Sequence, residues 1–154
     1  SNADLSNVNL QFANLSGANL TNATLWRAFA VSLEGSCPAA LPTSWDCIAM
    51  PSGRLVLVGP GANLWGVNLS GVDLSGVNLS EAALAYANLT GANLTGTNLH
   101  GAIIHHANLT NAIVTDAVLT DADLTNTLID RSSVEQAILC RTHLPWGQVL
   151  RDCN

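Results

Sequence analysis

Three histidines lie close together in the sequence and are the first side chains to consider for chemistry: His100, His105 and His106. A metal site needs imidazoles that converge on one point. His100 and His105 are five residues apart, in a chain that repeats every five residues, and this spacing would place them on adjacent faces of the molecule. We therefore predict solvated surface histidines, with no metal ion and no other cofactor.

The acidic residues give no sign of catalysis either. They are densest near the C-terminus, where the chain carries Asp116, Asp121, Asp123, Asp130 and Glu135. Their positions in the repeat spread them around several faces, which is typical of a solvated exterior. Ser, Thr and Asp fill outward repeat positions throughout the chain, so their presence near His does not indicate a catalytic triad. The glycines between Gly61 and Gly76 precede no predicted helix, which excludes a phosphate-binding loop. We predict a protein that is not an enzyme.

The four cysteines form two pairs that are local in sequence, Cys37 with Cys47 and Cys140 with Cys153. No C-x-x-C spacing occurs, so a zinc site or a thioredoxin-like motif has little support. Two disulfides are predicted, each contributing roughly 2–3 kcal/mol by restricting the unfolded chain. Disulfides imply an oxidising compartment. The alternative is four reduced thiols in a cytosolic protein.

Composition limits the classes of partner. The 154-residue chain is 48% hydrophobic and 10% charged, with no lysine and a net charge of −6. Such a chain does not bind nucleic acid by neutralising phosphates. No apolar run approaches the ~18 residues that indicate a membrane span. The first three residues, Ser1-Asn2-Ala3, are typical of the scar left when an expression tag is cleaved, so we expect any targeting segment to have been removed.

A leucine or another aliphatic residue recurs at every fifth position from Leu5 to Leu25 and again from Leu64 to Leu144. A period of five matches neither a helix nor a long strand. Two residues before each central leucine stands Ala or another small residue, which points to the same side of an extended segment. The residue between them, usually Asn, points outward, and the next two residues favour a turn. Each unit is thus a short strand and a bend, and stacked coils would pair like parallel strands about 4.8 Å apart.

Units such as Ala18-Asn19-Leu20-Thr21-Asn22 and Ala92-Asn93-Leu94-Thr95-Gly96 closely resemble the pentapeptide-repeat family. The resemblance covers roughly residues 3–25 and 62–144. It implies an all-β fold, a right-handed quadrilateral parallel β-helix with four units per coil. With 5 units in the first block and 17 in the second, about five and a half coils are expected. An open end of such a rod is an unpaired edge that invites end-to-end association.

The departures from the repeat divide this single domain into segments. We predict a cleavage scar (1–3), a first repeat block (4–25), a cysteine-containing insertion (26–61), a second repeat block (62–144) and a C-terminal hairpin that caps the rod (140–154). Within the insertion, Leu55–Val58 lies between glycines and is predicted to be a strand of a hairpin. The turn signal from Pro145 to Gly147 indicates the terminal hairpin. Both segments resemble those of secreted members of the family.

One surface feature suggests binding. Residues 20 apart would stack on one face of a four-unit coil, which brings Gly66, Tyr86, His106, Asn126 and Trp146 into one column, with Trp65 and His105 beside them. Aromatic side chains with polar tips suit a ledge that binds peptide or sugar. The alternative is that the insertion lies over Trp65 and Tyr86.

The leading interpretation is a non-enzymatic scaffold or interaction module with an unknown protein or carbohydrate partner. Its cysteines favour export to a periplasm, a thylakoid lumen or the extracellular space, and the resemblance favours a cyanobacterial source. The resemblance also implies an alternative, a DNA-mimicking regulator of DNA gyrase or another nucleic-acid enzyme. The thin, scattered negative charge and the cysteine-bearing insertion argue against that alternative.

Overall fold

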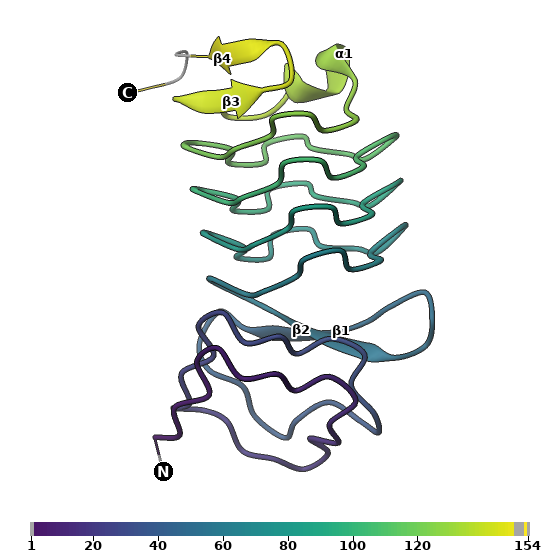
Figure 1. Cartoon of the computed structure of the whole chain (residues 1–154), viewed down its shortest axis with the longest axis vertical. Coiled ribbons are helices and arrows are strands. Elements are labelled where there is room, and N and C mark those ends of the chain that lie inside the picture. Colours follow the sequence, from purple (N-terminus) through teal and green to yellow (C-terminus); the bar gives the residue numbers. More distant parts are fainter. Residues whose placement is uncertain (1, 150–152, 154) are drawn as a thin grey trace.

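The computed structural model describes residues 2–149 and residue 153. The chain winds into a stack of similar coils that rises from the N-terminus to the C-terminus (Figure 1). Parallel bridges join residues 20 apart, such as Asn68 with Asn88 and Asn88 with Asn108. Four five-residue units therefore complete each turn, as the quadrilateral β-helix of pentapeptide-repeat proteins requires.

Each unit ends in a tight turn whose geometry explains the consensus Asn-Leu-Thr-Gly. In a representative unit, Ala92 N–H donates to the carbonyl of Leu89 (3.0 Å), and Gly91 between them has a positive φ of 65°. A positive φ at the third residue is characteristic of a type II turn and favours Gly or Asn. Asn88 Oδ1 accepts hydrogen bonds from the Thr90 N–H (3.1 Å) and from its hydroxyl (2.7 Å). The outward Asn therefore caps the turn.

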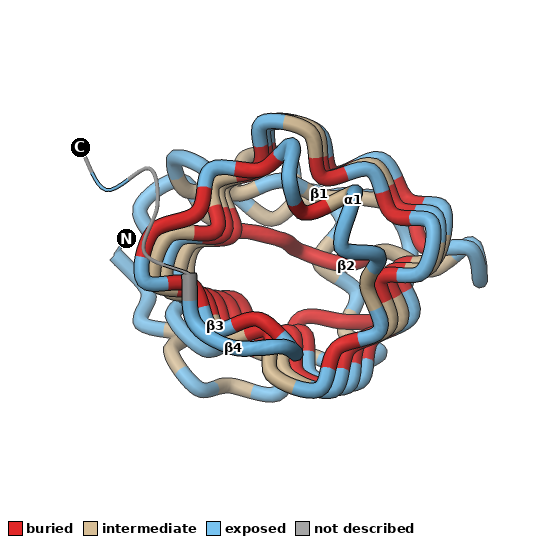
Figure 2. Tube along the Cα trace, turned by 90° about the horizontal axis from the view of Figure 1, so that it is seen from above, coloured by how far each residue is buried: buried red, intermediate tan, exposed pale blue. Residues whose placement is uncertain are grey.

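The core is a column of inward aliphatic side chains. Leu64, Leu84 and Ile104, which stack at 20-residue intervals, have no exposed surface. Buried positions line the inside of the coils in the view along the rod (Figure 2). The buried hydroxyl of Thr97 donates to the carbonyl of Leu74 (2.7 Å), so this polar group in the core is satisfied.

The expected insertion begins later than its predicted boundary at residue 26. Parallel bridges join Asn9 to Phe29, and likewise join residue 14 to 34 and residue 19 to 40. Residues 26–40 therefore continue the coil. The period was hidden because Ala30 and Gly35 stand where leucine is expected. The true interruption contains an antiparallel hairpin of β1 (Asp46–Ala49) and β2 (Leu55–Val58).

Two glycines that follow β2 allow the inserted hairpin to pack closely where it joins the second repeat block. A Cβ atom on Gly59 would lie 2.3 Å from the Trp45 ring, and one on Gly61 would lie 2.2 Å from the Trp26 ring. Gly61 also has a positive φ of 67°, and its carbonyl accepts from Arg27 N–H (2.9 Å). The Gly-Pro-Gly sequence is therefore needed where two indole rings approach the backbone closely.

The C-terminal end contains one element that the sequence did not predict. A short helix, α1 (Arg131–Val134), takes the place of the short strand expected in the five-residue unit centred on Val134. Val134 stays buried, so the apolar period is preserved although the backbone is helical. The antiparallel strands β3 (Thr142–Leu144) and β4 (Gly147–Val149) lie beside α1 at this end of the stack (Figure 1). No helix within residues 2–149 is long and apolar enough to cross a membrane.

Both local cysteine pairs are joined in the structure. Cys37 is bonded to Cys47 of β1, and Cys140 is bonded to Cys153. The first disulfide connects the second coil to the inserted hairpin, and the second connects the last coil to the chain that follows β4.

Candidate functional site

Four side chains form a continuous group of rings on one corner of the rod, which we call the aromatic surface: Trp65, Tyr86, His105 and His106. The Trp65 and Tyr86 ring centroids are 5.7 Å apart, and Tyr86 stacks on His106 at 4.9 Å with an interplanar angle of 7°. His105 lies edge-on to both Tyr86 (5.8 Å) and His106 (5.4 Å). These distances are those of favourable ring pairs.

The aromatic surface is open to solvent. Trp65 is 59% exposed and Tyr86 is 52% exposed. The inserted segment does not bury these rings, contrary to the alternative considered from the sequence. Large exposed rings in mutual contact are unusual on a surface that has no binding role.

The backbone beneath two of the rings is strained. Tyr86 has a φ of 61° and His106 a φ of 59°, both in the left-handed region. Neighbouring positions in the same column are Gly66 and Asn126, residue types that adopt this region readily. A bulky side chain there costs roughly 1 kcal/mol relative to glycine. Side chains kept at strained positions are frequent at functional sites.

Trp146 does not join this group, although the 20-residue column predicted it. Asn126, which has no ring, separates it from His106 in the column. Instead, the Arg131 guanidinium lies over the Trp146 ring, 4.9 Å from the centroid. Trp146 therefore packs with α1 at the end of the rod.

Trp65 lines two hollows, which the sequence did not reveal. One has a volume of about 460 Å³ and is lined by Asn7, Arg27, Gly61, Asn63, Trp65, Glu81, Ala83 and Ile103. The other, of about 290 Å³, includes Phe29, Ser32 and Met50 in its lining. One sequence signal existed: Arg27 and Glu81 occupy turn positions where Gly or Asn is usual, and both have a positive φ. Trp65 is thus shared by two hollows, one with opposite charges in its lining.

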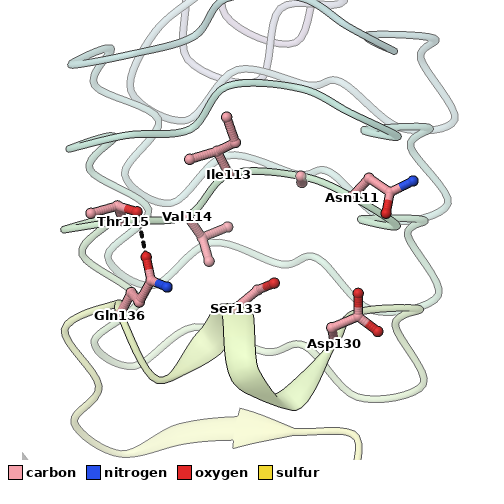
Figure 3. A pocket seen from close by; sticks show the side chains of 8 residues that line it. Asn111, Ile113, Val114, Thr115, Asp130, Ser133 and Gln136 are labelled. Carbon is pink, nitrogen blue, oxygen red and sulfur yellow. Dashed lines mark hydrogen bonds between the residues drawn. The ribbon is translucent and has the colours of Figure 1, made fainter.

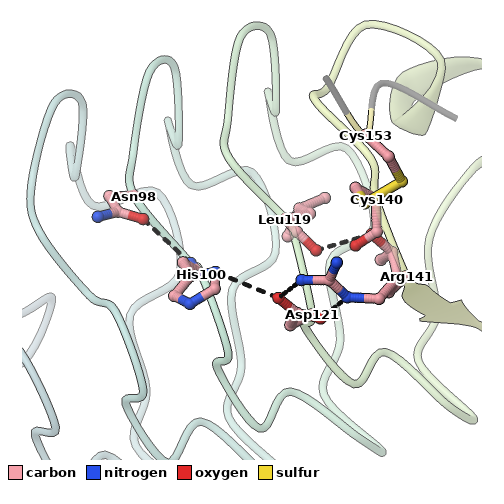
Figure 4. Close-up of polar contacts among 8 residues, drawn as sticks. Asn98, His100, Leu119, Asp121, Cys140, Arg141 and Cys153 are labelled. Atoms are coloured by element: carbon pink, nitrogen blue, oxygen red, sulfur yellow. Dashed lines mark hydrogen bonds and ion pairs between the residues drawn. A yellow bond between two sulfur atoms is a disulfide. The ribbon is translucent and has the colours of Figure 1, made fainter. Parts of the chain in front are cut away.

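The three histidines do not converge. His100 Nδ1 lies 3.7 Å from an oxygen of Asp121 (Figure 4). The His105 and His106 rings instead contact each other edge-on, at 5.4 Å, and both contact Tyr86. Among the described residues, no three His, Cys, Asp or Glu side chains are placed to hold a metal ion.

Asp121 also forms the shortest ion pair among the described residues. Arg141 donates from Nε to Oδ1 (2.5 Å) and from Nη2 to Oδ2 (2.6 Å), beside the Cys140–Cys153 disulfide (Figure 4). These hydrogen bonds, supported by the positive charge of Arg141, lower the pKa of the Asp121 carboxyl below its usual value. The bidentate contact ties the last coil to the coil before it.

We expect this pair to stabilise the C-terminal end fully above about pH 4, where free aspartate is ionised, and progressively less at lower pH. The folded pKa of Asp121 is lowered, so its contribution is present above the unfolded pKa and is lost as pH falls through the folded pKa. Asp121→Asn should lower the thermal midpoint at pH 6, and its difference from wild type should narrow as pH falls below about 4. Arg141→Gln should lower the thermal midpoint with the same dependence on pH. A difference that persists undiminished at pH 2 would contradict the assignment.

Comparison with known proteins places this chain among repeat proteins. A family model described as Pentapeptide repeats matches residues 1–29, 60–96 and 78–116 in eight copies, more than half of the chain. No curated protein matches. Among solved structures, this chain is similar to Rfr23 from the cyanobacterium Cyanothece 51142. The two are 32% identical over 60% of this chain and 56% of Rfr23 (TM-score 0.45).

Two further structures are similar. The protein alr5209 from Nostoc Pcc 7120 is 38% identical over 53% of this chain and 63% of that one (TM-score 0.44). QnrB1, a plasmid-mediated fluoroquinolone resistance protein, is 20% identical over 86% of this chain and 76% of that one (TM-score 0.47). The chain spans less than two thirds of the length of Rfr23 and of alr5209. The family match, the 20-residue bridge offset and the Asn-capped turns agree, and the chain belongs to the pentapeptide-repeat family.

Proposed function

We propose that this protein is a non-enzymatic interaction module that recognises a protein or carbohydrate partner through the aromatic surface. The observation that carries the proposal is the contact of four rings, three of them exposed and His105 partly buried, with two of the four on strained backbone. Fixed rings bury a large area on binding and lose little conformational entropy. Tyr86 also offers a hydroxyl and the histidines offer ring nitrogens to a polar partner.

The disulfides support an oxidising compartment for this function. Each bond joins a coil to a segment outside the regular repeat, Cys37 to Cys47 of β1 and Cys140 to Cys153. Such bonds persist in periplasmic, lumenal and extracellular proteins and are rare in the cytosol. We infer that the module acts after export, in a compartment of this kind.

A role as a DNA mimic has weaker support. A mimic of a duplex needs a regular line of free negative charge. Here Asp121 is paired with Arg141. His105 and His143 lie near Asp123 and contribute to lowering the pKa of its carboxyl. We expect no effect on DNA gyrase in a supercoiling assay at micromolar protein.

The proposal can be tested with a matched pair of substitutions. Tyr86→Gly removes one ring and relieves the positive φ, so we expect its stability to stay within about 1 kcal/mol of wild type. Phe12 is also an exposed ring at a positive φ (63°), and it lies in the N-terminal coil, where the Arg54 guanidinium is 5.1 Å from its centroid. Phe12→Gly is therefore the control.

The measurement is retention of partners on immobilised protein, from an exported-protein extract of the source organism and from a glycan array. We expect wild type and Phe12→Gly to retain the same partner in similar amounts. Tyr86→Gly and Trp65→Ala should each retain at least tenfold less of it. Equal retention by all four proteins, or no retained partner in either assay, would refute the proposal.

A further inference from the structure

The hydrogen-bonded ladder of the rod lacks one rung, next to α1. In a complete rung, one residue pairs twice with the coil before it. Leu119 N–H donates to the carbonyl of Ile138 (2.9 Å), and Ile138 N–H donates to the carbonyl of Ala117 (2.9 Å). By the same 20-residue offset, the partner of Ala112 and Val114 would be Ser133.

Ser133 does not supply these bonds, because it belongs to α1. Its N–H donates to the carbonyl of Asp130 (3.1 Å), and its carbonyl accepts from Gln136 N–H (3.2 Å). Within residues 2–149 and 153, the carbonyl of Ala112 and the N–H of Val114 have no hydrogen-bond partner. The helix therefore leaves one donor and one acceptor of the strand edge uncovered.

A pocket of about 320 Å³ lies over this uncovered edge (Figure 3). It extends from Asn111 at one end to Thr115 at the other, where the Thr115 hydroxyl donates to Gln136 Oε1 (2.8 Å). Its other wall consists of Asp130 and Ser133 of the α1 segment. This volume is at the small end of the range for ligand pockets.

We propose that this pocket binds an extended segment of a partner polypeptide, which supplies the missing rung. One residue of that segment would donate its N–H to the carbonyl of Ala112 and accept from Val114 N–H, as Ile138 does one face away. This is strand addition to a sheet edge, where the main chain supplies the affinity.

The lining also selects the side chain of that residue. Asp130 is exposed and makes no side-chain capping bond to α1. No other described residue forms an ion pair with it. In a rung the paired residue points outward, as Asn does in the repeat, and Asp130 is among the residues that line the pocket. A basic side chain complements that carboxylate.

The test is a titration of the intact, oxidised protein with acetyl-Ala-Lys-Ala-amide, followed by the amide signals of ¹⁵N-labelled protein. We expect the Val114 signal to shift and its hydrogen exchange to slow. An ester oxygen in place of the Lys N–H should weaken binding at least tenfold, whereas the same change at the first Ala, whose N–H and preceding acetyl carbonyl make no rung bond, should alter it less than twofold. Asp130→Asn should weaken binding about fivefold, and Asp46→Asn, an exposed carboxylate on β1, should leave it unchanged.

The site is independent of the aromatic surface, so Tyr86→Gly should bind this peptide normally. Loss of partner retention by that variant with intact peptide binding would therefore leave the present inference standing. Three results would overturn it: no shift at Val114, equal affinity for both esters and the parent peptide, or a Val114 amide already as protected in the free protein as that of Leu119.

Discussion

Leu94→Ala should lower the free energy of unfolding by about 3–5 kcal/mol, the largest effect expected of a single substitution in this chain. Leu94 lies in a middle coil with no exposed surface, and Leu74 and Val114 occupy the stacked positions below and above it. The backbone on both sides is fixed by the ladder, through Leu94 N–H to the carbonyl of Ile113 (2.7 Å) and Asn93 N–H to that of Val72 (3.0 Å). A rigid frame cannot collapse into the space left by the side chain, so the cavity remains.

The control for this substitution is Leu10→Ala. Leu10 has the same place in its unit, but it lies in the N-terminal coil and is only partly buried. We expect Leu10→Ala to cost less than half as much, because water already reaches the side chain. Urea unfolding followed by circular dichroism measures both. Equal costs at the two positions would contradict a core that is closed in the middle and open at the N-terminal end.

Cys37→Ser combined with Cys47→Ser should lower the free energy of unfolding by about 2–3 kcal/mol. The bond closes a loop of sequence separation 10 between the second coil and β1. Its loss frees that loop in the unfolded chain, and the coil contacts themselves remain. The loop contains Ala40, which pairs with Asn19 at an irregular offset of 21 residues, so the damage should be local.

The measurement is thermal and urea unfolding of the double variant beside wild type, with and without reductant. Reductant should destabilise both proteins through Cys140–Cys153, and the gap between them should close. Thiol titration of native, unreduced wild type should find no reactive thiol, since all four cysteines are bonded. Four titratable thiols would refute both the bonds and the export proposal.

The inward ladder was predictable because its signal is long and regular. A leucine at every fifth position with a small residue two before it leaves one inward face, and Leu64 and Leu84 lie there. The number of units per coil was not available from the period and came from the family resemblance. The 20-residue bridges agree with it.

Two parts of the fold could not be read from the apolar pattern. Residues 26–40 were not predicted to be part of the coil, because Ala30 and Gly35 interrupt the five-residue period of large aliphatic residues. The backbone pairing of the coil needs no particular side chain at these positions. Helix α1 was not predicted because Val134 is buried and continues the apolar period, although its backbone is helical. A period reports which residues are buried, and it does not report the hydrogen bonds that hold them.

The candidate site was predicted only in part. Stacking at 20-residue intervals placed Tyr86 over His106 correctly, and Trp65 beside them. The same rule extended the column to Trp146, although the intervening Asn126 cannot continue a line of rings. The hollow beside Trp65 and the missing rung at Val114 depend on how the insertion and α1 meet the coils, and no spacing rule describes those junctions.

The claim on which the account depends is that each coil pairs with the next at an offset of 20 residues. Scalar couplings transmitted across hydrogen bonds, between amide nitrogens and carbonyl carbons in labelled protein, test it directly. We expect couplings from Leu74 nitrogen to Asn93 carbonyl and from Asn93 nitrogen to Val72 carbonyl, repeated up the rod. Couplings between residues four apart, or offsets near 15 or 25, would show a helix or a different number of units per turn.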